Sequence, residues 1–208
     1  MPGPVGDWNQ RYADGDTPWD SGQPSLELQR VLNEHDIAPC RMLELGCGSG
    51  TNSVYLCQRG FDVTAIDISP LAIARAKDRG DAEGVNIDFR AVDLLKQPDL
   101  GGPFPFVFDR GLYHVLRRES LDAFRQALGG VAAPGGLYLT LAGNANDPVE
   151  MDEGPPQVSA VELCTELEPL FHVVALREFH FDGVQIQGQA VRPLAWSALL
   201  RRHNSPAK

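Results

Sequence analysis

The feature that most constrains this chain is a glycine-rich turn between a short apolar segment and a helix-forming one. The apolar run 41–45 passes directly into Gly46-Cys47-Gly48-Ser49-Gly50, and helical spacing continues from Thr51 to about Arg59, just before Gly60. Glycine lets the backbone turn tightly and approach a ligand, and the free amides at a helix start favour an anionic group. The sequence therefore predicts a strand, a ligand-binding turn and a helix at this point.

The alternation of apolar, β-branched runs with helix-period segments continues along the chain. We expect further strands at 62–66, 86–92, 104–108 and 137–141, and helices at 51–59, 71–79 and 117–128. This alternation is typical of a parallel sheet with covering helices. The expected fold class is therefore α/β, a Rossmann-like doubly wound sheet.

The pattern changes after residue 141. Residues 142–157 are rich in Gly, Asn, Asp and Pro, and they predict a long loop facing a substrate. A capping box at Ser159 opens a helix that ends near Pro169, and two more strands are expected at 171–178 and 194–200. Because no helical stretch separates these strands, they predict an antiparallel pair closing the edge of the sheet. The sheet is thus expected to be mostly parallel with an antiparallel C-terminal strand.

Composition narrows the partners and the compartment. The 208 residues fit one domain with a short appended segment, and a net charge of -10 opposes binding to nucleic acid or to an anionic membrane. Four cysteines without a CxxC pair or zinc-like spacing indicate neither a metal site nor a disulfide framework. Met1 to Tyr12 has no basic start before an apolar stretch, and no apolar window is long enough for a membrane span. We expect a cytoplasmic chain, and nothing in its composition indicates an oligomeric state.

Acidic residues follow the expected strands at the edge where ligands bind in open α/β sheets. Asp67, 17 residues after Gly50, is placed to accept hydrogen bonds from vicinal ribose hydroxyls, and Asp93 from the exocyclic amine of adenine. Leu94 or Leu95 would pack on the adenine ring, and an acidic rim suits a cationic sulfonium. The alternative interpretation is that these acids merely cap strands.

The run Leu43-Glu44-Leu45-Gly46-Cys47-Gly48-Ser49-Gly50, followed by Asp67, Asp93 and Asp109, resembles the class I S-adenosyl-L-methionine-dependent methyltransferases. The resemblance covers nearly the whole chain. The dinucleotide fingerprint GxGxxG fits less well, because glycine stands at the fifth position of the turn and Thr51 at the sixth. The resemblance implies S-adenosyl-L-methionine as the cofactor, with its methionine carboxylate at the glycine turn, and the seven-stranded fold of that superfamily.

Within that superfamily, a further set of residues resembles the thiopurine S-methyltransferase-like branch of small-molecule enzymes: Trp8, Tyr12, Thr17-Pro18-Trp19-Asp20, Pro24 and Asp109-Arg110-Gly111. This implies an N-terminal lid segment at 1–24, folded over the cofactor, and a methyltransferase domain at 25–208. Thiopurine enzymes carry Glu in place of Asp67 and have no evident counterpart of His114. Taken without the family, the Gly- and Pro-punctuated lid segment predicts no helix, and its tryptophans could simply attach the terminus to the core.

The candidate site follows from these motifs. The residues expected at the cofactor come from the lid, the glycine turn and the strand ends: Trp8, Trp19, Glu44, Gly46, Cys47, Gly48, Asp67, Ile68, Asp93, Leu94, Asp109 and Arg110. Arg110 and His114 are the candidate catalytic residues, because they follow the fourth strand, where the transferable methyl would be presented. Arg110 would bind an anionic or thiolate substrate, or act as a structural clamp. His114 would take a proton from a thiol or hydroxyl, or be a core histidine.

The expected function is methyl transfer to a small molecule with sulfur or another soft atom as nucleophile. The acceptor would lie between the lid, residues 110–114 and the 142–157 loop. Orientation of two bound reactants is worth roughly 7 to 11 kcal/mol, so a catalytic base is optional. Two alternatives remain open: a nucleotide-dependent oxidoreductase, which uses a similar glycine turn, and a cofactor-binding adaptor without chemistry.

Overall fold

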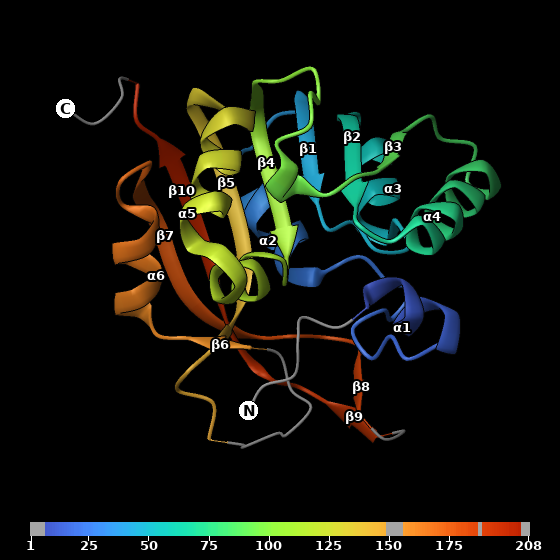
Figure 1. Cartoon of the computed structure of the whole chain (residues 1–208). Coiled ribbons are helices and arrows are strands. Elements are labelled where there is room, and N and C mark those ends of the chain that lie inside the picture. The colour runs from blue at the N-terminus through green and yellow to red at the C-terminus, as the bar shows by residue number, and fades with distance from the viewer. Residues whose placement is uncertain (1–6, 149–155, 187–188, 205–208) are drawn as a thin grey trace.

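The computed structural model describes residues 7–148, 156–186 and 189–204. Its main sheet has the strand order β3-β2-β1-β4-β5-β10-β7, with β6 paired beside β5, and a separate hairpin joins β8 to β9 (Figure 1). The strands are β1 (Arg41–Leu45), β2 (Asp62–Asp67), β3 (Asp88–Ala91), β4 (Phe104–Arg110), β5 (Ala132–Asn144), β6 (Gln157–Val158), β7 (Phe171–His180), β8 (Val184–Ile186), β9 (Gln189–Val191) and β10 (Leu194–Arg202).

Helices cover both faces of this sheet, and each face has its own apolar cluster. The helices are α1 (Trp8–Asp14), α2 (Leu26–Glu34), α3 (Thr51–Gln58), α4 (Pro70–Ala82), α5 (Tyr113–Val131) and α6 (Ala160–Leu167), with a short 3-10 turn η1 (Leu94–Lys96). One cluster contains buried residues of α5 and α6, and the other contains buried residues of α2, α3 and α4. None of the helices in the described ranges is long and apolar enough to cross a bilayer.

The strand directions confirm the predicted fold class. β1 pairs in parallel with β2 and β4, and the parallel pairing extends to β3 on one side and β5 on the other. β10 is antiparallel to both β5 and β7. The predicted antiparallel pair exists, but β10 lies inside the sheet while β7 forms the edge. Burial explains this order, because residues 195–200 of β10 are all buried whereas most of β7 is not.

Helix α5 begins four residues before the helix predicted from spacing. The Asp109 carboxylate accepts hydrogen bonds from the backbone N–H groups of Leu112 (2.9 Å) and Tyr113 (3.0 Å). These bonds satisfy amides that a helix start leaves free, so the helix can begin directly after β4. Of the loop expected at 142–157, residues 142–144 belong to β5, 157 belongs to β6, and 149–155 lie outside the described residues.

The prediction that the lid segment contains no helix is wrong. Asp7 accepts a hydrogen bond from the Gln10 N–H (3.1 Å) and starts α1, and Gly15, with φ of 73°, ends it in the left-handed conformation. These are ordinary helix-capping interactions, and a helix of only two turns is too short to show clear periodicity. The spacing of apolar residues also failed to predict α2 and the β8–β9 hairpin.

Candidate cofactor and acceptor site

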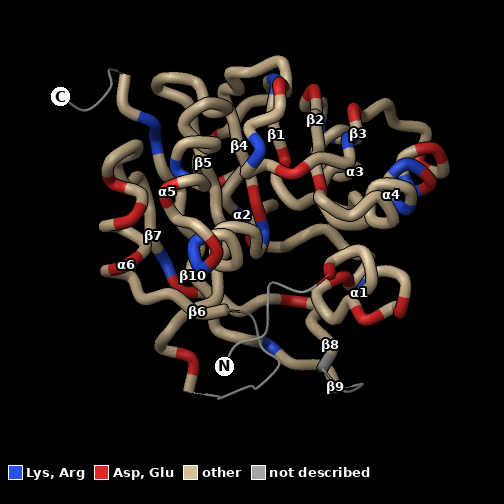
Figure 2. Tube along the Cα trace, in the orientation of Figure 1, with Lys and Arg blue, Asp and Glu red and all other residues tan. Residues whose placement is uncertain are grey.

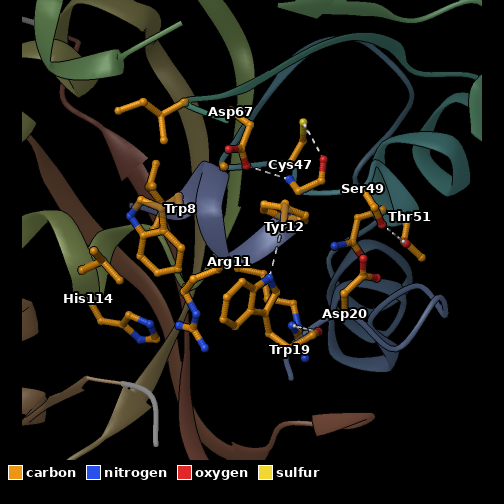
Figure 3. A pocket seen from close by; sticks show the side chains of 18 of the residues that line it. Trp8, Arg11, Tyr12, Trp19, Asp20, Cys47, Ser49, Thr51, Asp67 and His114 are labelled. Carbon is orange, nitrogen blue, oxygen red and sulfur yellow. Dashed lines mark hydrogen bonds between the residues drawn. The ribbon is translucent and has the colours of Figure 1, made fainter. Parts of the chain in front are cut away.

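A cavity of about 470 Å³ opens at the carboxyl ends of the central strands, next to α1 (Figure 3). This volume lies in the range of small-molecule and cofactor sites. The predicted site residues that line it are Trp8, Trp19, Gly46, Cys47, Gly48, Asp67, Ile68, Asp93, Leu94, Arg110 and His114. Segments far apart in sequence thus meet at one cavity, whereas Glu44 and Asp109 do not line it.

The glycine turn has the backbone geometry that its sequence predicts. Gly46, Gly48 and Gly50 have φ values of 66°, 56° and 79°, in the left-handed region that glycine adopts without strain. A Cβ at Gly48 would lie 2.8 Å from the Tyr12 hydroxyl oxygen. Gly48 therefore creates space where the lid meets the turn. Gly50 caps α3 without a side-chain hydrogen bond, which leaves amides at this helix start available to an anionic group.

Asp67 ends β2 beside the glycine turn. Its two carboxylate oxygens accept one backbone N–H each, from Gly48 and from Ser69, both at 2.9 Å. Each oxygen can accept a further hydrogen bond from a ligand, because a carboxylate has about four acceptor sites. Burial raises the pKa of Asp67 from its ordinary value, an effect that the backbone N–H donors oppose. The carboxylate is thus fixed in position and has capacity for a ligand with two hydroxyls.

Asp93 and Leu94 form the neighbouring part of the wall. Asp93 accepts the N–H of Leu95 at 2.9 Å and thereby caps η1. Leu94 is buried against the core, while Ile68, across the cavity wall, is 51% exposed. An acid next to two apolar side chains suits a flat ring that carries an amino group.

Glu44 and Asp109 support the site from behind. Asp109 is fully buried, and besides holding the start of α5 it accepts a hydrogen bond from the Tyr138 hydroxyl (2.5 Å). Glu44 is 2% exposed and accepts a hydrogen bond from the Ser53 hydroxyl. Burial, with the nearby charges of Asp67 and Asp109, raises the pKa of Glu44 to about 8. These two acids do not line the cavity, and in this structure Glu44 bonds to α3 while Asp109 holds the start of α5.

Glu44→Gln is expected to remove a pH dependence of stability. An unfolded glutamate ionises near pH 4.3, whereas the pKa of Glu44 in the folded chain is about 8. Between these values the folded state holds a proton that the unfolded state has released, so this stabilisation is full below pH 4.3 and is lost as the pH rises through 8. Urea unfolding from pH 5.5 to 8.5 should show wild-type stability falling by up to about 1.4 kcal/mol per pH unit. The Gln variant should show a flatter profile, and equal slopes would contradict the assignment.

The lid is an aromatic cluster attached to α4. The rings of Trp8 and Trp19 meet edge to face with centroids 5.4 Å apart, and the Arg11 guanidinium lies 4.3 Å from the Trp19 ring centroid (Figure 3). The Trp19 indole N–H donates to the Tyr12 hydroxyl at 3.4 Å. Arg75 of α4 also donates a hydrogen bond to the backbone carbonyl of Tyr12 (2.6 Å). The tryptophans therefore both line the cavity and attach the terminus to the core, so the two interpretations are compatible.

Arg110 joins the lid to the segment that follows β7. Its guanidinium donates to the backbone carbonyls of Trp19 and Asp182, each at 3.0 Å, and stacks over the Phe181 ring at 4.9 Å. Two carbonyls from distant segments therefore share one partly buried cation, and this geometry favours the clamp interpretation of Arg110. His114 lies four residues further along the chain, in the first turn of α5. Its Nδ1 accepts the N–H of Gly143 at 2.8 Å.

Several lining residues were not predicted from the sequence. They come from α1, the first turns of α5, and the segment around β8: Asn9, Arg11, Val115, Leu116, Glu119, Phe181, Asp182 and Val184. Those of α5 recur at helical spacing, so an earlier helix start would have identified them. The residues at 181–184 carry no local signal, because only the packing of β8 against the lid brings them to the cavity. Gln185 donates its N–H to the Pro18 carbonyl there at 2.8 Å.

The surroundings of the cavity are acidic. Figure 2 shows acidic residues gathered on and around α1, which borders the cavity. Asp7 and Asp20 of this region line the cavity, as do Asp67 and Asp93 on the opposite wall. Carboxylates at this density favour a cationic ligand over an anionic one of the same shape.

Residues 42–136 match the model of a family described as a methyltransferase domain. A curated relative from Mycobacteroides abscessus, 2-heptyl-1-hydroxyquinolin-4(1H)-one methyltransferase, is 31% identical over 148 residues, which cover 70% of this chain and 64% of that protein. The chain therefore spans slightly less than two thirds of this relative's length.

Solved structures share the fold at low sequence identity. A protein studied for the conversion of a disulfide bond into a thioacetal group during echinomycin biosynthesis has a TM-score of 0.82 at 24% identity, covering 95% of this chain and 92% of that chain. The 1,6-didemethyltoxoflavin-N1-methyltransferase of Burkholderia thailandensis, solved with S-adenosylhomocysteine, has a TM-score of 0.71 at 17% identity, covering 96% and 87%. These structures show that the chain has the fold of class I methyltransferases, and the family match covers the part of the chain that contains the glycine turn.

Proposed function

We propose that this chain transfers the methyl group of S-adenosyl-L-methionine to a small apolar molecule, with sulfur or another soft atom as nucleophile. The observation that carries the proposal is a single cavity lined by the glycine turn, Asp67, Asp93 and the start of α5. The first three fit the parts of the cofactor, and the fourth provides a wall for a second molecule. The thiopurine S-methyltransferase-like branch remains the proposed relationship within the superfamily.

The cofactor is assigned to the polar end of the cavity. The turn at Gly46 and Gly48 would hold the methionine carboxylate, Asp67 the ribose hydroxyls, and Asp93 with Leu94 the adenine. The remaining acceptor capacity of Asp67 and the uncapped start of α3 support this fit. When bound, this group supplies an electrophilic methyl on a sulfonium.

The acceptor is assigned to the apolar end. The apolar residues Leu112, Val115, Leu116, Phe181 and Val184 belong to the lining of the cavity and would form this end. This wall excludes water and aligns an apolar molecule, and orientation of this kind is worth roughly 7 to 11 kcal/mol. A thiol ionises near pH 8.5, so a thiolate is available near neutrality without a strong base, whereas an alcohol requires one. A soft nucleophile such as a thiol therefore needs no strong catalytic base among these residues.

The lid would complete the site. Residues 8–24 would close over the bound cofactor through Trp8, Tyr12 and Trp19, and residues 25–208 would form the domain that it covers. Arg110 would hold the lid in place from within the site, since it already binds the Trp19 carbonyl. The net charge of -10 further supports a small acceptor over nucleic acid.

A hydroxylated heteroaromatic is the second candidate acceptor. It is favoured by the mycobacterial relative, which is named for a hydroxyquinolone with a heptyl chain. Such a molecule is apolar and flat, as the acceptor wall requires. The same assay can therefore compare both acceptor classes.

The proposal is tested by binding and by methyl transfer. Calorimetry should show S-adenosylhomocysteine binding at micromolar level or tighter, and radiolabelled S-adenosyl-L-methionine should label thiophenol, 2-mercaptopyridine or 1-hydroxyquinolin-4-one. A fluorescence titration with NADH serves as the control and should show no comparable binding. Binding of NADH in place of the sulfonium cofactor would establish the oxidoreductase alternative. Cofactor binding without labelling of any acceptor would favour the adaptor.

A further inference from the structure

The two ring nitrogens of His114 have different surroundings. Nδ1 accepts the backbone N–H of Gly143, a residue of β5, at 2.8 Å. Nε2 has no hydrogen-bond partner among the residues that the structure describes, and His114 lines the cavity. Figure 3 shows the imidazole among the side chains that surround this space. Next to it, Gly111 leaves room for Nε2, since a Cβ there would lie 3.3 Å away.

The bond from Gly143 fixes the position of the proton. A backbone N–H can only donate, so Nδ1 must present its lone pair, and a neutral imidazole then carries its hydrogen on Nε2. A charged imidazolium would carry hydrogen on both nitrogens and would lose this bond. Burial lowers the pKa of His114 to about 3, with the positive charges of Arg110, Arg118 and Arg117 acting in the same direction. The ring is therefore neutral at ordinary pH.

We propose that His114 binds the methyl acceptor as a hydrogen-bond donor through Nε2–H and does not act as a base. This inference rests on the proposed function and makes its acceptor more specific. A base needs a free lone pair, and the only lone pair on this ring is used by Gly143. The substrate should therefore carry a nitrogen or oxygen that accepts this hydrogen bond.

The chemical class of the acceptor follows from the rest of the wall. Val115, Leu116, Phe181 and Val184 give the same cavity apolar lining, beside the charged Arg11 and Arg110. A donor without a partner in such a lining discriminates strongly, because a molecule without an acceptor atom leaves that donor unpaired. We therefore expect a heteroaromatic or acyl compound whose accepting nitrogen or oxygen lies beside its nucleophilic atom. A simple aryl thiol lacks that atom.

The tautomer can be tested without cofactor or acceptor. Uniformly 15N-labelled full-length chain should give two ring nitrogen signals for His114, assigned by their absence in His114→Gln. The expected result is a protonated Nε2 and an unprotonated Nδ1, with shifts that stay constant from pH 5.5 to 8.5. Titration within this range, or hydrogen on Nδ1, would overturn the inference even if the chain is a methyltransferase.

The donor role can be tested with two matched thiols. The thiolate of 2-mercaptopyridine has an accepting ring nitrogen beside its sulfur, and the thiolate of thiophenol lacks it. His114→Phe keeps the ring volume but removes both hydrogen bonds, while His114→Gln keeps one donor and one acceptor. Relative to wild type, His114→Phe should lower kcat/KM for 2-mercaptopyridine by roughly three- to tenfold more than for thiophenol, and His114→Gln should retain most of the difference.

The two roles predict different patterns. If His114 were a base, His114→Gln would be as damaging as His114→Phe, and both thiols would be affected alike. Loss of kcat/KM in that pattern would refute the donor assignment. If the wild-type chain methylates neither thiol, the proposed acceptor class is wrong, and the nitrogen spectra still decide the state of His114.

Discussion

Asp67→Ala is expected to lower the affinity for S-adenosylhomocysteine by at least about 100-fold. Hydrogen bonds to a charged group contribute about 1.5 to 3 kcal/mol each, and two ribose hydroxyls would lose their acceptor together. The same change frees the N–H groups of Gly48 and Ser69, which should loosen the turn that is proposed to hold the methionine carboxylate. Titration calorimetry at constant pH measures the loss directly.

A matched control lies on the same strand. Asp62 begins β2 at its exposed end, away from the cavity, so Asp62→Ala should bind S-adenosylhomocysteine as the wild type does. Asp67→Glu keeps the charge and restores the residue of thiopurine enzymes, so it should bind better than Asp67→Ala. An Asp67→Ala protein that folds and binds with unchanged affinity would remove Asp67 from the site.

Arg110→Met is expected to loosen the lid and to weaken S-adenosylhomocysteine binding by about 10- to 100-fold. Methionine keeps much of the apolar volume against Phe181 but loses two charge-assisted bonds, to the carbonyls of Trp19 and Asp182. Each such bond contributes about 1.5 to 3 kcal/mol. The expected loss of binding energy is smaller than their sum, because the other attachments of α1 still hold the lid. Hydrogen exchange should become faster over residues 8–24.

The alternative role of Arg110 predicts a different result. If the guanidinium binds substrate, Arg110→Met should raise KM for the acceptor while exchange of the lid and S-adenosylhomocysteine affinity stay unchanged. Arg118→Met is the control, because this arginine of α5 is outside the set of described residues that line the cavity. If hydrogen exchange over residues 8–24 is as slow in Arg110→Met as in the wild type, Arg110 does not clamp the lid.

The most accurate sequence predictions were those set by neighbouring residues. Strand 41–45 was predicted with both ends correct, and the turn at Gly46 to Gly50 has the left-handed backbone that its glycines suggest. The capping box at Ser159 was also found, with Glu162 as its partner. In each case the deciding interactions lie within a few residues, so a local pattern contains the information.

The features that the sequence left open or predicted wrongly are those that contacts between distant residues decide. β10 lies inside the sheet because β5 and β7 bury it from both sides, which no local pattern reveals. Helix α1 is too short for periodicity to indicate it, and it packs against α4 through Arg75. The residues at 181–184 reach the cavity only because the hairpin packs on the lid.

The sequence by itself determined the sheet alternation, the glycine turn and the acids at the strand ends, because backbone conformation and strand order along the chain depend on near neighbours. Only the tertiary structure decided which groups Arg110 and His114 bond to. The partners of Arg110 lie 91 and 72 residues away, and the Gly143 amide that sets the proton of His114 lies 29 residues away. A guanidinium or an imidazole is defined by what it bonds, and at these separations only folding brings the partners together.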